Sequence, residues 1–208
     1  AEGGKQELLP YPPRTYLDAS VSSDGLHASV SVIEGGRYLL HVLGLDRNRQ
    51  SDRVLDLPGS NWLSFWHPKD NRQLAFRSMR KGDFDTFIKD VMSSDPAKEF
   101  LATDFDDSPL GWIPPDGKFM LISQSTPAGR YPIQQVDVAE PGKMKVLVDE
   151  PLAEMVEASP DGRWLAMVLT RGRQEIYVRP LFRDGVPVPI SAKGGQAVAW
   201  SRRRGEVL

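Results

Sequence analysis

Five aspartates gather in one part of the chain and could together bind a hard metal ion. They are Asp83, Asp85, Asp104, Asp106 and Asp107. Carboxylate oxygens are the ligands that Ca²⁺ and Mg²⁺ prefer in proteins. However, the calcium-loop pattern of alternating acidic residues, a glycine and a distal glutamate does not occur here. We therefore favour a solvated loop over a metal site, and we predict no metal ligand.

The residue types that commonly serve in catalysis form no recognisable motif. The three histidines, His27, His41 and His67, lack the spacing of zinc-binding motifs, and cysteine is absent. No serine lies in a Gly-x-Ser-x-Gly elbow, and the sequence has neither a phosphate-binding glycine loop nor a kinase catalytic loop. The sequence thus predicts no catalytic residue and no cofactor site. Packing or surface roles are expected for the histidines.

Charge and hydropathy exclude two further classes of protein. The 208 residues include 26 Lys and Arg against 28 Asp and Glu, which gives a net charge of -2. This near balance argues against a nucleic-acid-binding surface, and the basic run Arg202-Arg203-Arg204 is better explained as an exposed turn between two strands. No apolar run approaches the length of a membrane-spanning helix. We therefore predict no nucleic-acid partner and no membrane span in this chain.

A repeat organises the chain and must position any binding residue. Asp24, Asp70, Asp116 and Asp161 follow one another at intervals of 46, 46 and 45 residues. Each lies in a predicted tight turn, where Pro presets φ, Asp accepts backbone hydrogen bonds and Gly adopts a left-handed conformation. The turn residues are Asp24-Gly25, Asp70-Asn71, Pro115-Asp116-Gly117 and Pro160-Asp161-Gly162.

The last position of each turn is expected to have a positive φ. Asn71 stands there in the second repeat, because Asn tolerates the left-handed conformation better than most residues. Gly117 and Gly162 should likewise need a positive φ. Replacing either glycine with Val should therefore destabilise the fold.

Four short runs rich in β-forming residues fill each repeat. Several are apolar almost throughout, which suits strands that are buried on both faces. One window, residues 151–158, also fits a helical turn, but the other repeats have a strand at this place. Four strands in about 45 residues match one blade of a β-propeller. The sequence thus predicts an all-β propeller of four-stranded antiparallel blades, with full blades at residues 11–58, 59–104, 105–151 and 152–194.

The fourth repeat carries a motif that resembles a known family. The run Ser159-Pro160-Asp161-Gly162-Arg163-Trp164, followed by Tyr177-Val178-Arg179-Pro180, resembles the WD40-like PD40 repeat of TolB-type propellers. Together with Gly194-Gly195 and Trp200-Ser201, it is also similar to the C-terminal propellers of bacterial membrane-anchored Ser/Thr protein kinases. The resemblance covers nearly the whole chain, and it implies a sensor module in an extracytoplasmic or periplasmic location.

The residues at both ends of the chain do not make up a whole blade. Residues 3–9 are predicted as the outer strand of a preceding blade, and residues 197–208 as two inner strands of a following one. Propellers of this kind usually have about six to eight blades, so we favour a fragment of a larger ring. The alternative is a small ring closed by pairing these terminal strands, which would leave an incomplete blade with an open edge.

Three functions are compatible with this sequence. The kinase resemblance favours a non-catalytic binding or sensor module, because a rigid scaffold can present its loops to a protein or small ligand. The first alternative is the gating propeller of a prolyl-oligopeptidase-like S9 serine peptidase, whose catalytic triad would lie in another domain. The second is a TolB-like periplasmic adaptor that binds a lipoprotein partner.

The tryptophans offer one candidate for a ligand contact. Trp66, Trp112, Trp164 and Trp200 recur near the inner strands of the repeat, so we expect them to pack between blades. Trp62 lies outside this pattern. If any aromatic residue lines a face of the propeller, Trp62 is the better candidate.

Overall fold

The computed structural model describes residues 8–46, 51–150, 153–201 and 205–207, and every regular element within them is a β-strand. The strands form four sheets, here called blades 1 to 4. Blades 1 and 2 contain β1 (Tyr16–Val21), β2 (His27–Glu34), β3 (Arg37–Gly44), β4 (Asp52–Val54), β5 (Ser60–Trp66), β6 (Gln73–Met79), β7 (Asp85–Asp90) and β8 (Lys98–Leu101). Blades 3 and 4 contain β9 (Asp107–Ile113), β10 (Phe119–Gln124), β11 (Ile133–Asp137), β12 (Met144–Val148), β13 (Ala153–Ala158), β14 (Trp164–Arg171), β15 (Arg173–Pro180) and β16 (Val188–Pro189).

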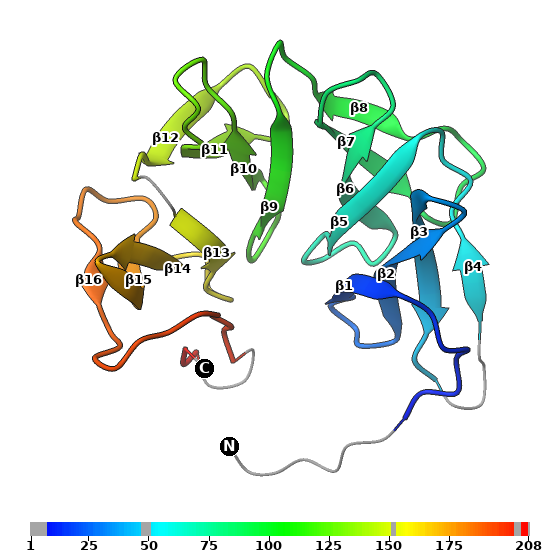
Figure 1. Ribbon diagram of the computed structural model, residues 1–208, viewed down its shortest axis with the longest axis horizontal. Coiled ribbons are helices and arrows are strands. Elements are labelled where there is room, and N and C mark those ends of the chain that lie inside the picture. Colours follow the sequence, from blue (N-terminus) through cyan, green and yellow to red (C-terminus); the bar gives the residue numbers. More distant parts are fainter. Residues whose placement is uncertain (1–7, 47–50, 151–152, 202–204, 208) are drawn as a thin grey trace.

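Each blade is an antiparallel meander of four consecutive strands. The blades stand side by side around an open arc, with β1, β5, β9 and β13 nearest its centre and β4, β8, β12 and β16 at its rim (Figure 1). The predicted all-β propeller architecture is thereby confirmed. The window at residues 151–158 is a strand, β13, from residue 153 onward. No helix of the described residues is long and apolar enough to cross a membrane.

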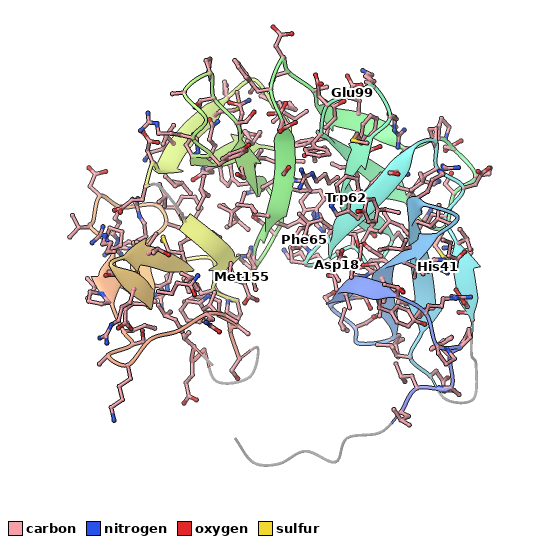
Figure 2. All side chains as sticks on the ribbon, in the orientation of Figure 1. Asp18, His41, Trp62, Phe65, Glu99 and Met155 are labelled. Carbon is pink, nitrogen blue, oxygen red and sulfur yellow. The ribbon has the colours of Figure 1, made fainter. Side chains whose placement is uncertain are left out.

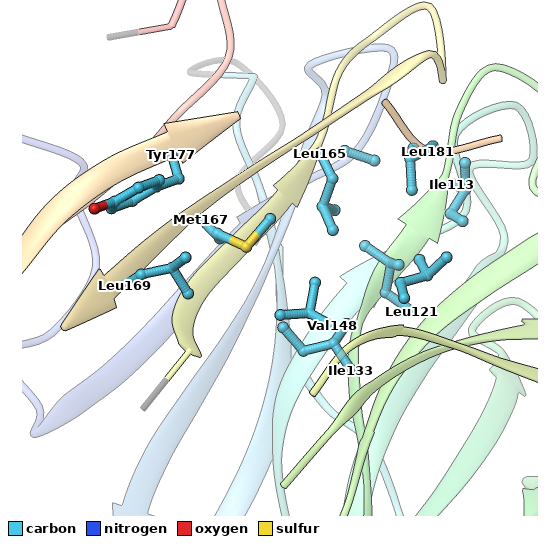
Figure 3. Packing of buried hydrophobic residues seen from close by; sticks show 11 residues of the cluster. Ile113, Leu121, Ile133, Val148, Leu165, Met167, Leu169, Tyr177 and Leu181 are labelled. Atoms are coloured by element: carbon cyan, nitrogen blue, oxygen red, sulfur yellow. The ribbon is translucent and has the colours of Figure 1, made fainter. Parts of the chain in front are cut away.

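The hydrophobic core is divided into layers between neighbouring blades. Between blades 3 and 4, for example, Leu121 and Ile133 face Leu165 and Met167, all of them almost fully buried (Figure 3). Similar clusters join blades 1 and 2 and blades 2 and 3. Because β10 and β14 are covered on both sides, they carry nearly continuous apolar runs. In β2, by contrast, the buried serines Ser29 and Ser31 alternate with apolar residues.

The free side of blade 1 is covered by the segment that precedes β1. Tyr11 packs there against Val30, Val32 and Leu43, and its hydroxyl donates a hydrogen bond to the carbonyl of Gly44. An aromatic ring thus covers part of the apolar side that a preceding blade would otherwise bury.

The predicted partial blades lie mostly outside the described residues. This holds for the strand at residues 3–9, of which only Leu8 and Leu9 are described, and neither belongs to a strand. Near the other end of the chain, Trp200 forms an isolated antiparallel bridge with Val207. The described strands form no fifth sheet, so the larger ring and the small closed ring both stay predictions.

Successive turns in an antiparallel meander lie at opposite ends of its strands. One end of the propeller, here called the Asp-turn face, therefore holds the four Asp turns that join the first and second strands of each blade. The other end, here called the hairpin face, holds the β2–β3, β6–β7, β10–β11 and β14–β15 hairpins.

Candidate binding face

Nearly the same hydrogen bonds recur at the Asp-turn face. In blade 1, the Ser22 hydroxyl donates to Asp24 Oδ1 at 2.6 Å, and Leu26 N–H donates to the same oxygen at 2.9 Å. Blade 4 repeats the pattern, with the Ser159 hydroxyl donating to Asp161 Oδ1 at 2.5 Å. This hydrogen bond, with others from Arg163, lowers the pKa of Asp161 to about 2 because it favours the carboxylate.

The turn glycines have the expected left-handed conformation, and two of them also sit at contacts between blades. The φ angles of Gly25, Gly117 and Gly162 are 72°, 69° and 70°. A Cβ atom on Gly162 would lie 1.9 Å from the backbone oxygen of Pro114 in blade 3, whereas a Cβ on Gly25 would meet nothing within 4 Å. Gly162 therefore serves both the turn and the packing of blade 4 against blade 3.

Asn71 does not have the left-handed conformation that its position predicts. Its side chain instead contacts the turn of blade 1, where Asn71 Oδ1 accepts a hydrogen bond from the Ser23 hydroxyl at 2.7 Å. The reason for an asparagine at this position was therefore predicted wrongly. The residue contributes a contact between blades, and not a positive φ.

Three tryptophans join neighbouring blades through their indole nitrogens. Trp66 and Trp112 are 7% and 6% exposed, and their Nε1 atoms donate to the carbonyls of Ser20 and Phe65 in the preceding blade. Trp200 donates in the same way to a carbonyl of β13. The expectation of packing between blades was wrong for Trp164, which begins β14 with 42% of its surface exposed.

The predicted acidic stretch does not converge on one point. Asp107 is buried, and its carboxylate accepts hydrogen bonds from Thr103 N–H and Gln124 Nε2. Asp106 accepts one from Phe84 N–H and so holds the β6–β7 hairpin. The other three are divided between the interior and the surface: Asp85, which is buried, and Asp83 and Asp104, which are exposed. In the described part of the chain, no three His, Asp or Glu side chains are placed to hold a metal ion.

Two of the histidines lie against tryptophans. The ring of His67 contacts Trp112 at 4.7 Å between centroids, and its Nδ1 accepts the backbone N–H of Asp70 at 3.0 Å. His27 lies 6.2 Å from Trp66. The basic run at residues 202–204 lies outside the described residues.

The third histidine is buried beside the charged side chains of Arg14, Glu34 and Asp52 in blade 1. His41 is 1% exposed, and its Nδ1 lies 2.7 Å from Asp52 Oδ1. Burial alone would raise the pKa of Asp52, but hydrogen bonds from His41 and Arg14 outweigh it and hold that pKa below its usual value. A histidine held by a carboxylate resembles part of a hydrolase triad. Here, however, His41 Nε2 lies 3.7 Å from the carboxylate of Glu34 and has no hydrogen-bond partner among the described residues, so no hydroxyl nucleophile is paired with it.

At the hairpin face, Trp62, whose place is labelled in Figure 2, belongs to a cluster of aromatic rings around one arginine, here called the Trp62 site. The ring of Trp62 lies 4.8 Å from Tyr38 and 5.3 Å from Phe84, between centroids. Arg77 is the cross-strand neighbour of Trp62, and its guanidinium carbon lies 3.5 Å from the Phe84 ring centroid. Tyr131, on the next hairpin, is 58% exposed and close enough to act electrostatically on Arg77.

A bulge in β5 fixes the position of Trp62. The next residue, Leu63, has a φ of 54°, which is rare for a branched side chain. Its N–H faces Asp18 Oδ2 and Ser31 Oγ of blade 1, each at 3.3 Å. The pairing of the first and second strands has a register shift in each of the four blades, so the bulge belongs to the repeat, and in blade 2 it redirects the side chain of Trp62. The neighbouring blade thus holds the strand in the conformation that positions Trp62.

Sequence reasoning identified Trp62 but missed Arg77, Phe84 and Tyr131. A comparison of the repeats contains a signal for Arg77. It follows its turn aspartate by seven residues, and the corresponding positions in the other blades hold Ser31, Ser123 and Val168. Phe84 and Tyr131 lie outside or at the edge of the strands, where the repeat gives no comparable alignment.

Two hollows on the described surface lie away from the Trp62 site. One, of about 310 Å³, lies between the Asp turns of blades 3 and 4 and is lined by Pro115, Asp161 and Phe182, among others. The other, of about 500 Å³, lies at the rim between blades 2 and 3 beside Phe100 and Pro141. Neither contains an aromatic cluster around a buried cation.

Comparisons with known proteins agree on the architecture. No protein-family model and no curated protein sequence matches this chain. Among solved structures, TolB from Acinetobacter baumannii matches with a TM-score of 0.70 at 15% identity, over 90% of this chain and 46% of its own. A putative TolB from Agrobacterium tumefaciens also gives 0.70, at 17% identity, over 83% of this chain and 63% of its own. The fold is a TolB-type β-propeller.

The same propeller fold also occurs in enzymes. A structure from a study of two prolyl endopeptidases matches with a TM-score of 0.57 at 16% identity, over 88% of this chain and 29% of its own. This TolB-type propeller therefore spans less than two thirds of each of these three structures. Identities this low establish the shared fold alone.

Proposed function

We propose that this chain is a non-catalytic propeller module that binds a protein or small ligand at its hairpin face. The Trp62 site is the observation that carries the proposal. It combines the exposed ring of Tyr131, the half-buried ring of Trp62 and the cation of Arg77 on neighbouring hairpins of a rigid scaffold. Aromatic residues and arginine dominate the binding energy of many protein interfaces.

We further propose that the module is the extracytoplasmic sensor region of a membrane-anchored Ser/Thr kinase. The PD40-like motif of the fourth repeat and the Gly194-Gly195 and Trp200-Ser201 pairs support this assignment. The structural likeness to prolyl endopeptidases and to TolB keeps the gating propeller and the periplasmic adaptor as alternatives. The neighbouring coding sequence separates these hypotheses. A kinase domain and a membrane span would support the sensor region, and a serine hydrolase domain would support the gating propeller.

Selection of peptides from a random display library against the folded chain tests the binding function. We expect selected peptides to bind the wild type and to lose at least about tenfold in affinity to Tyr131→Ala, measured by fluorescence anisotropy. Phe182→Ala is the matched control, because Phe182 is 52% exposed on the Asp-turn face. Its affinity should stay at the wild-type value.

Two results would overturn the proposal. One is a selection that yields no peptide with saturable binding. The other is a set of peptides whose affinity falls with Phe182→Ala and not with Tyr131→Ala, because that would place the recognition surface on the Asp-turn face.

A further inference from the structure

Arg77 is held by aromatic rings and has no acceptor within the described part of the protein. Its guanidinium carbon lies 3.5 Å from the ring centroid of Phe84 and 5.0 Å from that of Trp62. Its Nε is buried and makes no hydrogen bond. Leaving a buried donor unpaired costs about 1–3 kcal/mol. Burial also lowers the pKa of Arg77, which shows that the charged form is partly desolvated here.

A second arginine on the same hairpin shows how such a cation is normally satisfied. Arg80 also lies against a ring, 3.8 Å from the centroid of Phe87. However, its Nε donates to the Ser78 hydroxyl at 2.9 Å, and its Nη2 donates to Asn61 Oδ1 at 3.3 Å. Arg80 therefore has partners of its own, whereas Arg77 has ring contacts alone.

The acidic group that acts on Arg77 is partly engaged elsewhere. Asp106 acts electrostatically on Arg77, but its Oδ1 accepts the N–H of Phe84 and its own N–H donates to Ser125. It orders the hairpin that carries Phe84. The fold itself also does not require a cation at this position, because the corresponding residues of the other blades are uncharged.

The chemistry of this environment selects one kind of ligand. A planar guanidinium with free terminal N–H groups matches a carboxylate, which can accept two parallel hydrogen bonds. The nearby charge of Asp106 disfavours a doubly charged group such as phosphate. The rings of Trp62 and Tyr131 provide apolar surface beside the cation.

We propose that the Trp62 site recognises a peptide carboxylate next to an apolar side chain, with Arg77 binding the carboxylate and Trp62 and Tyr131 contacting the apolar group. This assignment rests on the proposed binding function and specifies its ligand. Arg77 is thus the specificity residue of the hairpin face.

The test titrates the protein with N-acetyl-L-phenylalanine as a minimal probe and monitors the indole N–H of Trp62 by ¹H–¹⁵N NMR. The variant Trp62→Phe identifies that signal by its loss. We expect a saturable shift with a dissociation constant in the millimolar range, weakened at least about tenfold in Arg77→Gln. Arg77→Lys should bind with intermediate affinity, because Lys keeps the charge but not the planar fork. Arg72→Gln is the control, since Arg72 is exposed and already paired with Asp90.

Matched ligands complete the experiment. N-acetyl-L-phenylalanine amide should bind at least about tenfold more weakly than N-acetyl-L-phenylalanine, and inorganic phosphate should bind more weakly than either. The proposal would be overturned if the amide bound as tightly as the acid, if phosphate bound more tightly than the acid, or if the Trp62 indole N–H showed no saturable shift. If display-selected peptides depend on Tyr131 but lack carboxylates and are insensitive to Arg77→Gln, the carboxylate assignment is wrong and the binding function stands.

Discussion

The two faces of the propeller follow different rules. On the Asp-turn face, blades 1 and 4 use the same serine, aspartate and backbone hydrogen bonds, although they stand at opposite ends of the arc. On the hairpin face, blade 2 places Arg77 where the other blades have Ser or Val, and it surrounds that cation with rings. The first face repeats, and the second departs from the repeat.

This difference separates stability from recognition. A residue that recurs in each blade satisfies a demand that each blade makes, such as closing a turn or packing on a neighbour. A residue that breaks the repeat at a cost, such as an unpaired buried donor, meets no such demand. We therefore expect substitutions on the Asp-turn face to reduce stability, and substitutions at the Trp62 site to reduce binding with little effect on stability.

The largest expected effect is that of Gly162→Ala. The left-handed conformation costs about 1–2 kcal/mol for any residue with a Cβ, and the contact with the carbonyl of Pro114 adds about 1–3 kcal/mol of packing strain. We expect a loss of about 3 kcal/mol in the free energy of unfolding, measured by urea denaturation.

Gly25→Ala is the matched control for this prediction. It has the same left-handed conformation but open space around its Cβ position, so its loss should be about 1 kcal/mol. Equal losses in the two variants would show that Gly162 serves the turn alone and that contact between blades contributes nothing.

A smaller effect is expected at Asp161 as the pH falls. Because its folded pKa is about 2, below the ordinary value of 3.8, its contribution to stability is present above about pH 4 and is lost as the pH falls towards 2. The side chain is 46% exposed, so screening limits the effect to less than about 1 kcal/mol. The difference in unfolding free energy between wild type and Asp161→Asn should therefore shrink from about pH 5 to about pH 2.5. A constant difference would contradict this account of the turn.

The smallest effect on stability is expected at Arg77. Arg77→Met removes a cation–π contribution of about 0.5–2 kcal/mol, but it also removes a buried unpaired donor that costs about 1–3 kcal/mol. We expect a net change of less than about 1 kcal/mol in urea denaturation.

Arg80→Met is the comparison for this variant. It would leave the buried Asn61 Oδ1 without its donor and should cost about 2 kcal/mol. A loss for Arg77→Met as large as that for Arg80→Met would place Arg77 among the structural residues and weaken the contrast between the two faces.

Most of the fold was predictable because it depends on local chemistry that repeats. A turn aspartate with its acceptor oxygen appears in the sequence between the first and second strands of each blade, and four copies reveal the period even where Pro is missing, as at Ser23. The strands follow from apolar runs between these turns. Less of the candidate site was predictable: Trp62 was found as an exception to the repeat, and its partners were not.

The sequence alone determined the repeat, the strand order and the all-β architecture, since each rests on contacts between residues near one another in the chain. Only the tertiary structure showed that Asn71 joins two turns and that Phe84 and Trp62 enclose Arg77. It also showed that Leu63 has a positive φ and that its N–H donates to acceptors of blade 1. These features depend on how neighbouring blades and loops pack. Side chains distant in sequence meet there, and no local pattern encodes their meeting.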